Sequence, residues 1–186
     1  MSPRFSSRIV FVAAFLCLFT LVPFREHAAT AESSVASVQE YRLRLYHTHT
    51  NRRIDVVYRV GDRYVPRVLD QLNGFLADHR TGDVRKYDPR VFDLLYKLTV
   101  AAGRPSAEID VVCGYRTPQS NGFLRRTTVG VAEHSRHMLG QAIDIRVPGV
   151  STLALRNLAL ELQVGGVGYY PKSQFVHVDV GPVRRW

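Results

Sequence analysis

The sequence predicts an α+β fold in which flanking helices cover an antiparallel sheet, and its length, composition and periodicity support this class. The 186 residues are enough for one domain with a sizeable core. Hydrophobic residues make up 46% and charged residues 22%, close to the average of globular proteins, which excludes wholesale disorder. Strand-like and helix-like patterns are partly segregated along the chain, as is typical of antiparallel sheets packed against helices.

The first 31 residues have the layout of a secretory signal peptide. Arg4 and Arg8 precede an almost entirely apolar stretch over residues 9–24, and Ala-Thr-Ala at residues 29–31 offers a cleavage site. A retained membrane anchor is the alternative, although the apolar stretch is short for a span of ~20 residues. The chain is therefore expected to be exported to the periplasm or cell envelope, and to associate with a membrane only if this segment is retained.

After a short polar tether over residues 32–40, residues 41–186 are expected to form one domain, present as a monomer. The formal net charge of +9 suggests an anionic partner, and cell-wall polymer is one such partner in an envelope. The arginines are scattered rather than gathered on one helix, and there is no nucleic-acid-binding motif, so no nucleic-acid partner is expected. Cys113 is the single cysteine of this domain, which excludes a disulfide within it.

The first half of the domain is predicted to form a hairpin followed by two helices. Apolar and polar residues alternate over residues 41–46 and again over residues 54–60, as in two half-buried strands joined by a turn. Apolar residues at helical spacing over residues 65–79 predict the first helix. A second helix is expected over residues 88–103, with Asp88 as the N-cap residue and Gly103 ending it.

The second half begins with a short apolar run over residues 109–113, which predicts a central strand. Residues 114–136 follow as a long loop rich in glycine, proline, serine and threonine, and a loop of this length in a compact domain is usually functional. Four further elements are predicted after it: strands over residues 142–147, 165–170 and 175–180, and a helix over residues 152–162 that Ser151 caps.

Two of these predicted strands place titratable side chains on the face opposite the core. Side chains alternate between the two faces of a strand, and the isoleucines and valines of each strand must face the core. Asp144 in the first strand, and His177 and Asp179 in the second, then point to the opposite face.

His137 lies just before the first of these strands, and Gly140 allows the chain to bend so that His137 returns toward Asp144. Two imidazoles and a carboxylate match the ligands of a catalytic Zn²⁺, which takes three protein ligands and leaves a position for water. The alternative is a set of hydrogen-bonded or surface side chains without a metal. Spacing alone leaves both interpretations open.

The pattern S-x-H-x-x-G-x-A-x-D over residues 135–144, followed by V-H-x-D over residues 176–179, resembles the signature of a zinc peptidase superfamily. That superfamily includes D-alanyl-D-alanine carboxypeptidases, murein endopeptidases and the hedgehog signalling domain. Residues 114–121 are similar to its SGYRSPxxN motif, with Cys113 where serine is common. The segment over residues 175–186 is especially similar to the exported K-type branch of murein endopeptidases.

The resemblance implies a hedgehog/D-Ala-D-Ala peptidase-like fold for residues 41–186 and a role for each motif residue. His137, Asp144 and His177 would be the zinc ligands. Arg116 would bind a carboxylate or carbonyl of the peptide substrate, because its planar guanidinium suits a bidentate carboxylate contact. The alternative for Arg116 is a loop arginine tied to backbone carbonyls.

The general base is the point at which the sequence departs from many relatives. Several branches have Glu or Asp three residues before the last ligand, where this chain has Gln174, which takes no proton at useful pH. Asp179 is the replacement that we favour as a catalytic group, since it shares a face with His177. Its alternative role is to orient a zinc-bound imidazole. Glu133 and His134 are further candidates for proton transfer.

Two other features are expected to be structural. His47 and His49 alternate with threonines at the end of a strand and are expected to face solvent rather than bind a metal. Cys113 follows a buried strand and is expected to be an inert packing thiol.

The leading hypothesis is a zinc-dependent peptidoglycan peptidase, and in particular an endopeptidase that cleaves stem-peptide cross-links with a zinc-activated water. The positive charge suits a substrate rich in carboxylates. A non-hydrolytic zinc-binding module that binds or regulates the cell wall is the alternative, since the hedgehog-type relatives keep the metal without the same role. A structural envelope protein without a metal is the third hypothesis.

Overall fold

The computed structural model describes residues 38–186, so the predicted signal peptide over residues 1–31 and most of the tether over residues 32–40 lie outside the described residues. The described part is α+β, with helices packed against one eight-stranded sheet, which confirms the predicted fold class. Within it, no helix is both long and apolar enough to span a bilayer.

The sheet has the strand order β3-β2-β1-β4-β5-β7-β6-β8 and is mostly antiparallel. The pairs β1–β4 and β6–β8 are parallel. The strands are β1 (Glu40–His47), β2 (Arg53–Val60), β3 (Arg63–Tyr64), β4 (Glu108–Cys113), β5 (Ala142–Arg146), β6 (Gly166–Tyr170), β7 (Phe175–Asp179) and β8 (Arg184–Arg185). The predicted hairpin and the predicted closing pair of strands are both confirmed, as β1–β2 and β6–β7.

The helices of the described part lie near the predicted ranges. They are α1 (Pro66–Phe75), α2 (Arg90–Ala101), α3 (Pro118–Thr127), the 3₁₀ helix η1 (Arg136–Leu139) and α4 (Thr152–Glu161). The hydroxyl of Ser151 accepts a hydrogen bond from the N–H of Ala154 at 3.2 Å, so Ser151 caps α4 as predicted. Helix α2 begins two residues later than predicted, and the carboxylate of Asp88 accepts from the N–H of Arg90 at 3.1 Å.

The prediction of a loop throughout residues 114–136 is wrong, because α3 occupies ten of these residues. The start signal for this helix was present in the sequence. Thr117 is the N-cap, and its hydroxyl accepts from the N–H of Ser120 at 3.1 Å, while Pro118 begins the helix. The low apolar content of α3 concealed it: Phe123 and Leu124 are its large apolar residues, and only Ser120 and Asn121 are buried.

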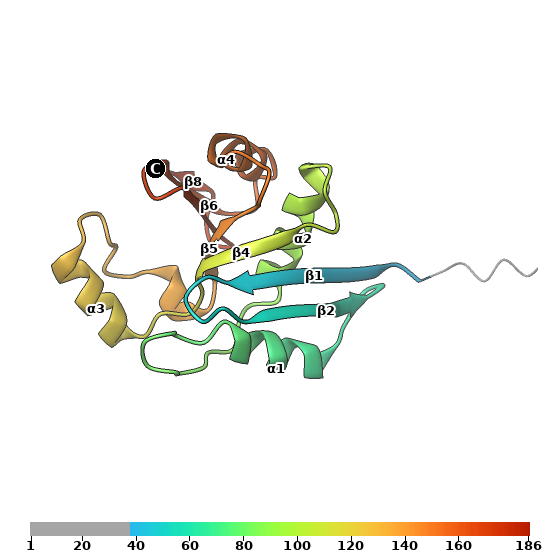
Figure 1. Cartoon of the computed structure of the whole chain (residues 1–186), viewed down its shortest axis with the longest axis horizontal. Helices are drawn as coiled ribbons and strands as arrows, with labels where there is room; N and C mark the ends of the chain where they lie inside the picture. Colours follow the sequence, from blue (N-terminus) through green and yellow to red (C-terminus); the bar gives the residue numbers. More distant parts are fainter. Residues whose placement is uncertain (1–37) are drawn as a thin grey trace, which may run out of the picture. The chain divides into compact units, whose positions relative to one another are not determined.

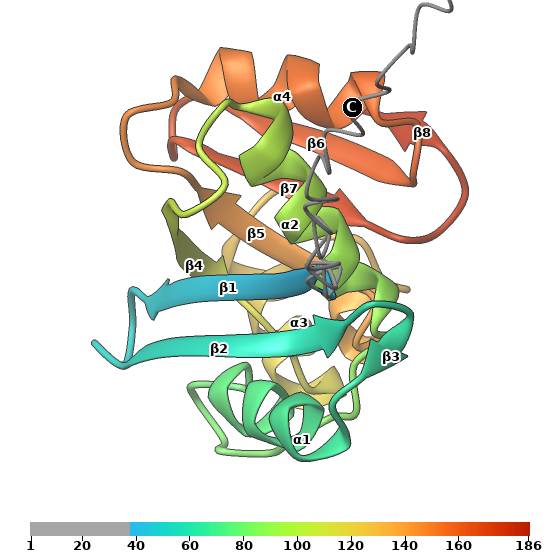
Figure 2. The ribbon, with the colours of Figure 1, turned by 90° about the vertical axis from the view of Figure 1, so that its right-hand side faces the viewer.

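The sheet separates the main core from the region of the predicted site. Figure 2 shows α2 in front of the sheet and α3 behind it, and Figure 1 shows α3 set apart from the sheet at the opposite end from α2. Helices α2 and α4 contact the sheet and each other. The side chains of Ile143, Ile145, Val176 and Val178 are almost fully buried in this core, as alternation predicted. Burial of one such side chain stabilises the fold by ~1.5–3 kcal/mol.

Candidate metal centre

Strand register brings together residues that are far apart in the sequence. In the antiparallel pair β5–β7, Asp144 lies directly opposite His177, and in the pair β4–β5 Cys113 lies opposite Asp144. Directly opposed residues on one face have Cβ atoms ~4.5–5.5 Å apart. The three side chains therefore form one row across the sheet, on the face away from the helices α2 and α4.

His137 reaches this row from the turn that precedes β5. It lies in η1, whose N-cap residue Ser135 accepts from the N–H of His137 at 3.4 Å. The turn ends at Gly140, which has a left-handed φ of +65°, and an added Cβ there would lie 2.7 Å from the carbonyl oxygen of Lys86. Both the backbone angle and the close neighbour require glycine, so the predicted bend at Gly140 is confirmed.

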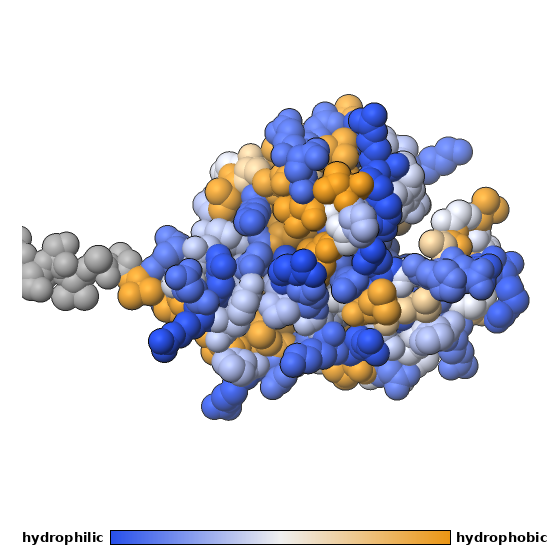
Figure 3. Space-filling view, turned by 180° about the vertical axis from the view of Figure 1, so that it is seen from behind, coloured by the Kyte–Doolittle hydropathy of each residue, from blue (hydrophilic) through white to orange (hydrophobic). Residues whose placement is uncertain are grey.

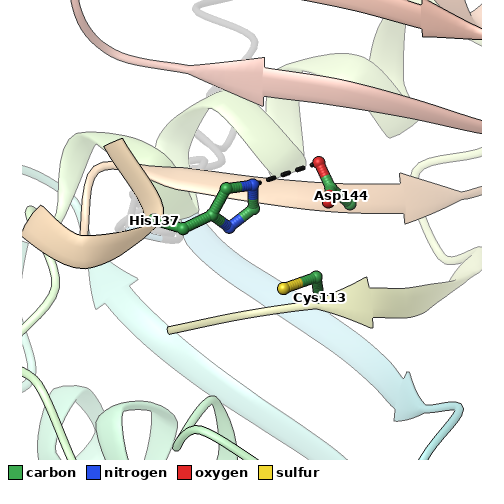
Figure 4. Close-up of side chains that lie close together, drawn as sticks. All are labelled: Cys113, His137 and Asp144. Carbon is green, nitrogen blue, oxygen red and sulfur yellow. Dashed lines mark hydrogen bonds and ion pairs between the residues drawn. The ribbon is translucent and has the colours of Figure 1, made fainter. Parts of the chain in front are cut away.

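Three potential ligand atoms converge at the centre of the site. The Nε2 of His137 lies 3.2 Å from Oδ1 of Asp144 and 3.1 Å from Nδ1 of His177, and this Nδ1 lies 2.9 Å from the same Oδ1. All three residues are at most 6% exposed. Figure 4 shows His137 and Asp144 pointing toward each other, with Cys113 beside them at the end of β4.

The outer nitrogen of each imidazole is held by an acceptor. The Nδ1–H of His137 donates to the carbonyl oxygen of Gly114 at 2.8 Å, and the Nε2–H of His177 donates to Oδ2 of Asp179 at 3.2 Å. These acceptors require N–H groups on the outer nitrogens, so the inner nitrogen of each neutral ring is the one that can offer its lone pair to a cation beside Asp144. Metal-ligating histidines are fixed in this way by carbonyl and carboxylate partners.

This donor set fits a zinc ion. Bonds of ~2.0–2.1 Å in a tetrahedral site place ligand atoms ~3.3 Å apart, and the three observed separations of 2.9–3.2 Å are close to that value. Cys113, His137 and Asp144 also have donor atoms within 4.8 Å of one another. The Nδ1 of His177 lies closer still, at 3.1 Å from Nε2 of His137 and 2.9 Å from Oδ1 of Asp144. The convergent triad is therefore His137, Asp144 and His177.

The electrostatics of the triad favour a positive charge at its centre. Burial favours the uncharged form of Asp144, but His137 and His177 outweigh this effect and hold the pKa of the carboxyl well below its usual value. Burial lowers the pKa of His137, but Asp144 and Cys113 outweigh it and raise the pKa to about 10. A proton or a metal cation can supply the charge that this arrangement stabilises.

Asp179 is fully buried behind His177, and its carboxylate is held by several donors. Its Oδ1 accepts from the N–H groups of Gly166 at 2.9 Å and Gly181 at 2.8 Å, and its Oδ2 accepts from Arg184 at 2.7 Å. Burial raises the pKa of Asp179, but its hydrogen bonds, first that from His177, hold the pKa well below its usual value. Asp179 is not among the residues that line the cavity beside the triad.

Arg116 is 9% exposed and lies beside the triad. Its guanidinium donates to Oδ1 of Asn121 at 3.2 Å and contacts Sγ of Cys113 at 3.4 Å, and it lies 3.8 Å from Oδ2 of Asp144. No side-chain hydrogen bond to a backbone carbonyl is formed within the described residues, and Nε is buried without a partner. The guanidinium is therefore positioned by side chains at the edge of the cavity.

The triad lies in a cavity of about 620 Å³. Figure 3 shows the surface hollowed where α3 and the loop after it stand away from the body. The cavity is strongly basic: four arginines line it, Arg80, Arg116, Arg136 and Arg184. Asp144 is the only carboxylate among the described residues of this lining.

One structural expectation is wrong and another is incomplete. Cys113 is buried, at 8% exposed, as expected of a packing thiol, but it also lines the cavity beside His137. His47 is fully buried rather than solvent-facing, because it packs against Phe75 of α1 with ring centroids 5.9 Å apart. His49 is exposed, as expected, but it stacks on His79 at 4.0 Å and lines the cavity.

The candidates for proton transfer lie in different places. Gln174 is exposed and outside the cavity of the triad, and its carbonyl accepts from Arg146 at 2.8 Å. Glu133 is exposed on the loop after α3 and pairs with Arg125 at 3.3 Å. His134 is exposed and lines the cavity.

Aromatic residues of the cavity were missed from the sequence. Tyr170, Phe175 and Trp186 line one side of it. Alternation in β7 already put Phe175 on the face of His177, and that signal could have identified it. Trp186 reaches the cavity through the pairing of β8 with β6, which no local pattern predicts.

Comparison with known proteins gives one family. The family described as peptidoglycan L,D-endopeptidase MepK matches residues 35–186. The probable peptidoglycan L,D-endopeptidase MepK of Haemophilus influenzae is 41% identical over 138 residues, which are 74% of each chain. The peptidoglycan L,D-endopeptidases MepK of Escherichia coli and Shigella flexneri are 39% identical over 144 residues, covering 77% of this chain and 79% of theirs. The resemblance to the K-type branch is thereby confirmed, and the chain belongs to the peptidoglycan L,D-endopeptidase MepK family.

Proposed function

We propose that this protein is a zinc-dependent peptidoglycan endopeptidase that hydrolyses stem-peptide cross-links. The observation that carries the proposal is the convergence of Nε2 of His137, Oδ1 of Asp144 and Nδ1 of His177 within 3.2 Å, with the outer nitrogens held by other partners. Membership of the family supports the substrate, since the relatives are named for this activity.

The basic cavity supports the same substrate class. Peptidoglycan stem peptides carry free carboxylates, and a cleft lined by one sign of charge attracts ligands of the opposite sign. In this proposal Arg116 binds a carboxylate or carbonyl of the stem peptide next to the scissile amide, because its fork is held at the cavity edge by Asn121 and Cys113.

His137, Asp144 and His177 would hold the zinc ion. A bound zinc ion supplies Lewis-acid chemistry, since it polarises a carbonyl and lowers the pKa of a water molecule to about 7. Asp179 orients His177 by accepting from its outer nitrogen, and Gly114 orients His137 in the same way. Because Asp179 is fully buried and outside the cavity lining, the geometry favours this orienting role over that of the general base.

His134 is the candidate that we assign to proton transfer. It is exposed to the cavity, whereas Glu133 pairs with Arg125 away from it. A general base must come within hydrogen-bond reach of the proton that it takes, and a side chain on the loop after α3 can approach a bound peptide. We further propose that the enzyme is exported to the periplasm or cell envelope, and that it acts as a monomer.

A zinc-binding module without hydrolytic activity is the second candidate. It is favoured by one observation: apart from Asp144, no carboxylate lines the described part of the cavity, so the usual acidic base has no counterpart there. Such a module would bind stem peptides through the same arginines.

Mass spectrometry of muropeptides tests these alternatives. Purified sacculi are treated with residues 32–186, with and without a chelator, beside a His177→Ala variant. Loss of cross-linked dimers only with the zinc-loaded wild type supports the endopeptidase, and trimmed monomer stems would indicate a carboxypeptidase instead. An unchanged profile from protein that contains zinc would favour the binding module, and protein that binds no zinc would contradict both.

A further inference from the structure

One side of the cavity is an aromatic wall formed by Tyr170, Phe175 and Trp186. The rings of Tyr170 and Phe175 stack with centroids 4.5 Å apart, and the Nε1–H of Trp186 donates to the hydroxyl of Tyr170 at 2.9 Å. The indole centroid lies 5.2 Å from that of His177. The wall therefore begins directly beside the metal centre.

The backbone holds the indole in this place. The N–H of Trp186 donates to the carbonyl oxygen of Val167 at 3.2 Å, and its carbonyl oxygen accepts from the N–H of Tyr169 at 3.1 Å. Gly168 lies opposite His177 in the sheet, and a Cβ added to it would come within 2.7–2.8 Å of three indole atoms. Because glycine has no side chain, the indole can pack directly against the backbone of β6 at this position.

Although it is held on one side, Trp186 remains 50% exposed. Its N–H is used by Tyr170, and the Cζ of Arg184 lies over the ring at 5.0 Å from its centroid, so the indole presents to the cavity the apolar ring surface that Arg184 leaves uncovered. The arginines line the same cavity and suit the carboxylates of a substrate. Unlike the arginines, the aromatic wall is apolar, and an apolar surface suits an aliphatic group of a ligand.

We propose that Trp186 is a substrate-positioning residue whose indole packs against the aliphatic side chain of the amino acid at the scissile amide. The inference rests on the proposed endopeptidase function. The indole lies beside His177, where the cleaved bond would be bound. Only a substrate group within about one residue of that bond can therefore contact the indole. The glycan strand is attached several residues away, so the aliphatic arm of a cross-linking diamino acid is the group that fits.

The protein contains one tryptophan, so its intrinsic fluorescence reports on this wall alone. Addition of Co²⁺ to metal-free protein should quench the emission, because the paramagnetic ion would bind beside the indole. Titration of the zinc protein with a purified cross-linked muropeptide dimer should then shift the emission to shorter wavelength as the indole is covered. Unchanged emission at saturating dimer, with binding verified by calorimetry, would overturn the proposal.

Kinetics and calorimetry on variants separate positioning from a structural role. For Trp186→Ala we expect KM and Kd for the dimer to rise about tenfold, with kcat within about twofold and zinc content unchanged. Trp186→Phe should recover most of the affinity, and Gly168→Ala should weaken binding by displacing the indole. The matched control is Val183→Ala, at a 55% exposed residue outside the cavity lining, which should behave as the wild type.

The length of the aliphatic arm gives the sharpest test. Synthetic cross-linked peptides with a shorter diamino acid should bind wild type more weakly, and Trp186→Ala should lose this discrimination. If Trp186→Ala loses zinc, or weakens long and short peptides equally, the indole has a structural role and the proposal is wrong. If the wild type binds dimers but cleaves none, the proposed endopeptidase function is wrong. The role of Trp186 is then decided by the Kd values of wild type and Trp186→Ala for the long and short peptides.

Discussion

The cavity joins two groups of histidines that differ in what surrounds them. His137 and His177 face the carboxylate of Asp144, and their inner nitrogens converge with its oxygen within 3.2 Å. At the other group, His49 and His79 stack face to face at 4.0 Å with an interplanar angle of 8°, and His47 lies behind them with its Nε2 buried and unpartnered. Among the described residues, no cluster that could hold a metal ion includes these three histidines.

The pKa values follow this difference. Burial, and after it the neighbouring His49 and Arg80, lower the pKa of His79 to about 4. At His137 the charge of Asp144 outweighs burial and raises the pKa to about 10. Burial alone thus favours neutral imidazole, and it is the carboxylate together with the fixed outer nitrogens that makes a centre for a cation.

Removal of one ligand should produce the largest effect. His177→Ala leaves His137 and Asp144 without the third donor, so we expect zinc content to fall well below one ion per chain and cross-link cleavage to be lost. The loss should exceed the ~10–100-fold typical when only the partner of a ligand is removed. Elemental analysis and muropeptide profiling measure both effects.

The matched control is His79→Ala in the second group of histidines. It should keep a full complement of zinc, because its imidazole makes no contact with the triad. Equal zinc loss in both variants would mean that the two groups bind metal together, which would contradict the comparison.

Asp179 should have the next largest effect. Asp179→Asn keeps the size of the side chain but removes the negative charge that His177 and Arg184 contact. We expect zinc affinity to fall ~10–100-fold, measured by competition with a chromophoric chelator, while Asp62→Asn on the surface leaves it unchanged. Unaltered zinc affinity with lost turnover would instead identify Asp179 as the general base.

A substitution in the turn before β5 should have a smaller effect, on the stability of the fold as well as on zinc binding. Gly140→Ala introduces a Cβ 2.7 Å from the carbonyl oxygen of Lys86, at a φ of +65°. We expect the free energy of unfolding to fall by ~1–3 kcal/mol and zinc binding to weaken, as the displaced turn moves His137.

Chemical denaturation measures this loss, and Gly82→Ala is its control. Gly82 has a similar φ of +78° with nothing within 4 Å, so it carries the backbone strain without the collision. A Gly140 variant no weaker in stability than the Gly82 variant would show that the contact with Lys86 is unimportant.

The sequence predicted the parts of the site that depend on local pattern. Alternation in β5 and β7 placed Asp144, His177 and Asp179 on one face, and the family resemblance assigned the ligands. It could not show that Asp144 lies opposite His177, because strand register between distant segments depends on the packing of the whole sheet. The burial of His47 and the approach of Trp186 depend on tertiary contacts in the same way, so no periodicity could indicate them.

The smallest expected effect is a pH dependence of stability from the second group of histidines. The pKa of His79 is about 4 in the folded protein and its ordinary value is 6.5, so the unfolded chain binds a proton more readily between these values. Stability should therefore fall as pH is lowered from about 6.5 to about 4, and this contribution should level off below. In His79→Gln the slope of unfolding free energy against pH should be shallower over this range than in the wild type. An unchanged slope in the His79 variant would mean that protonation of His79 does not destabilise the folded protein. Burial would then not explain why this group of histidines differs from the metal centre.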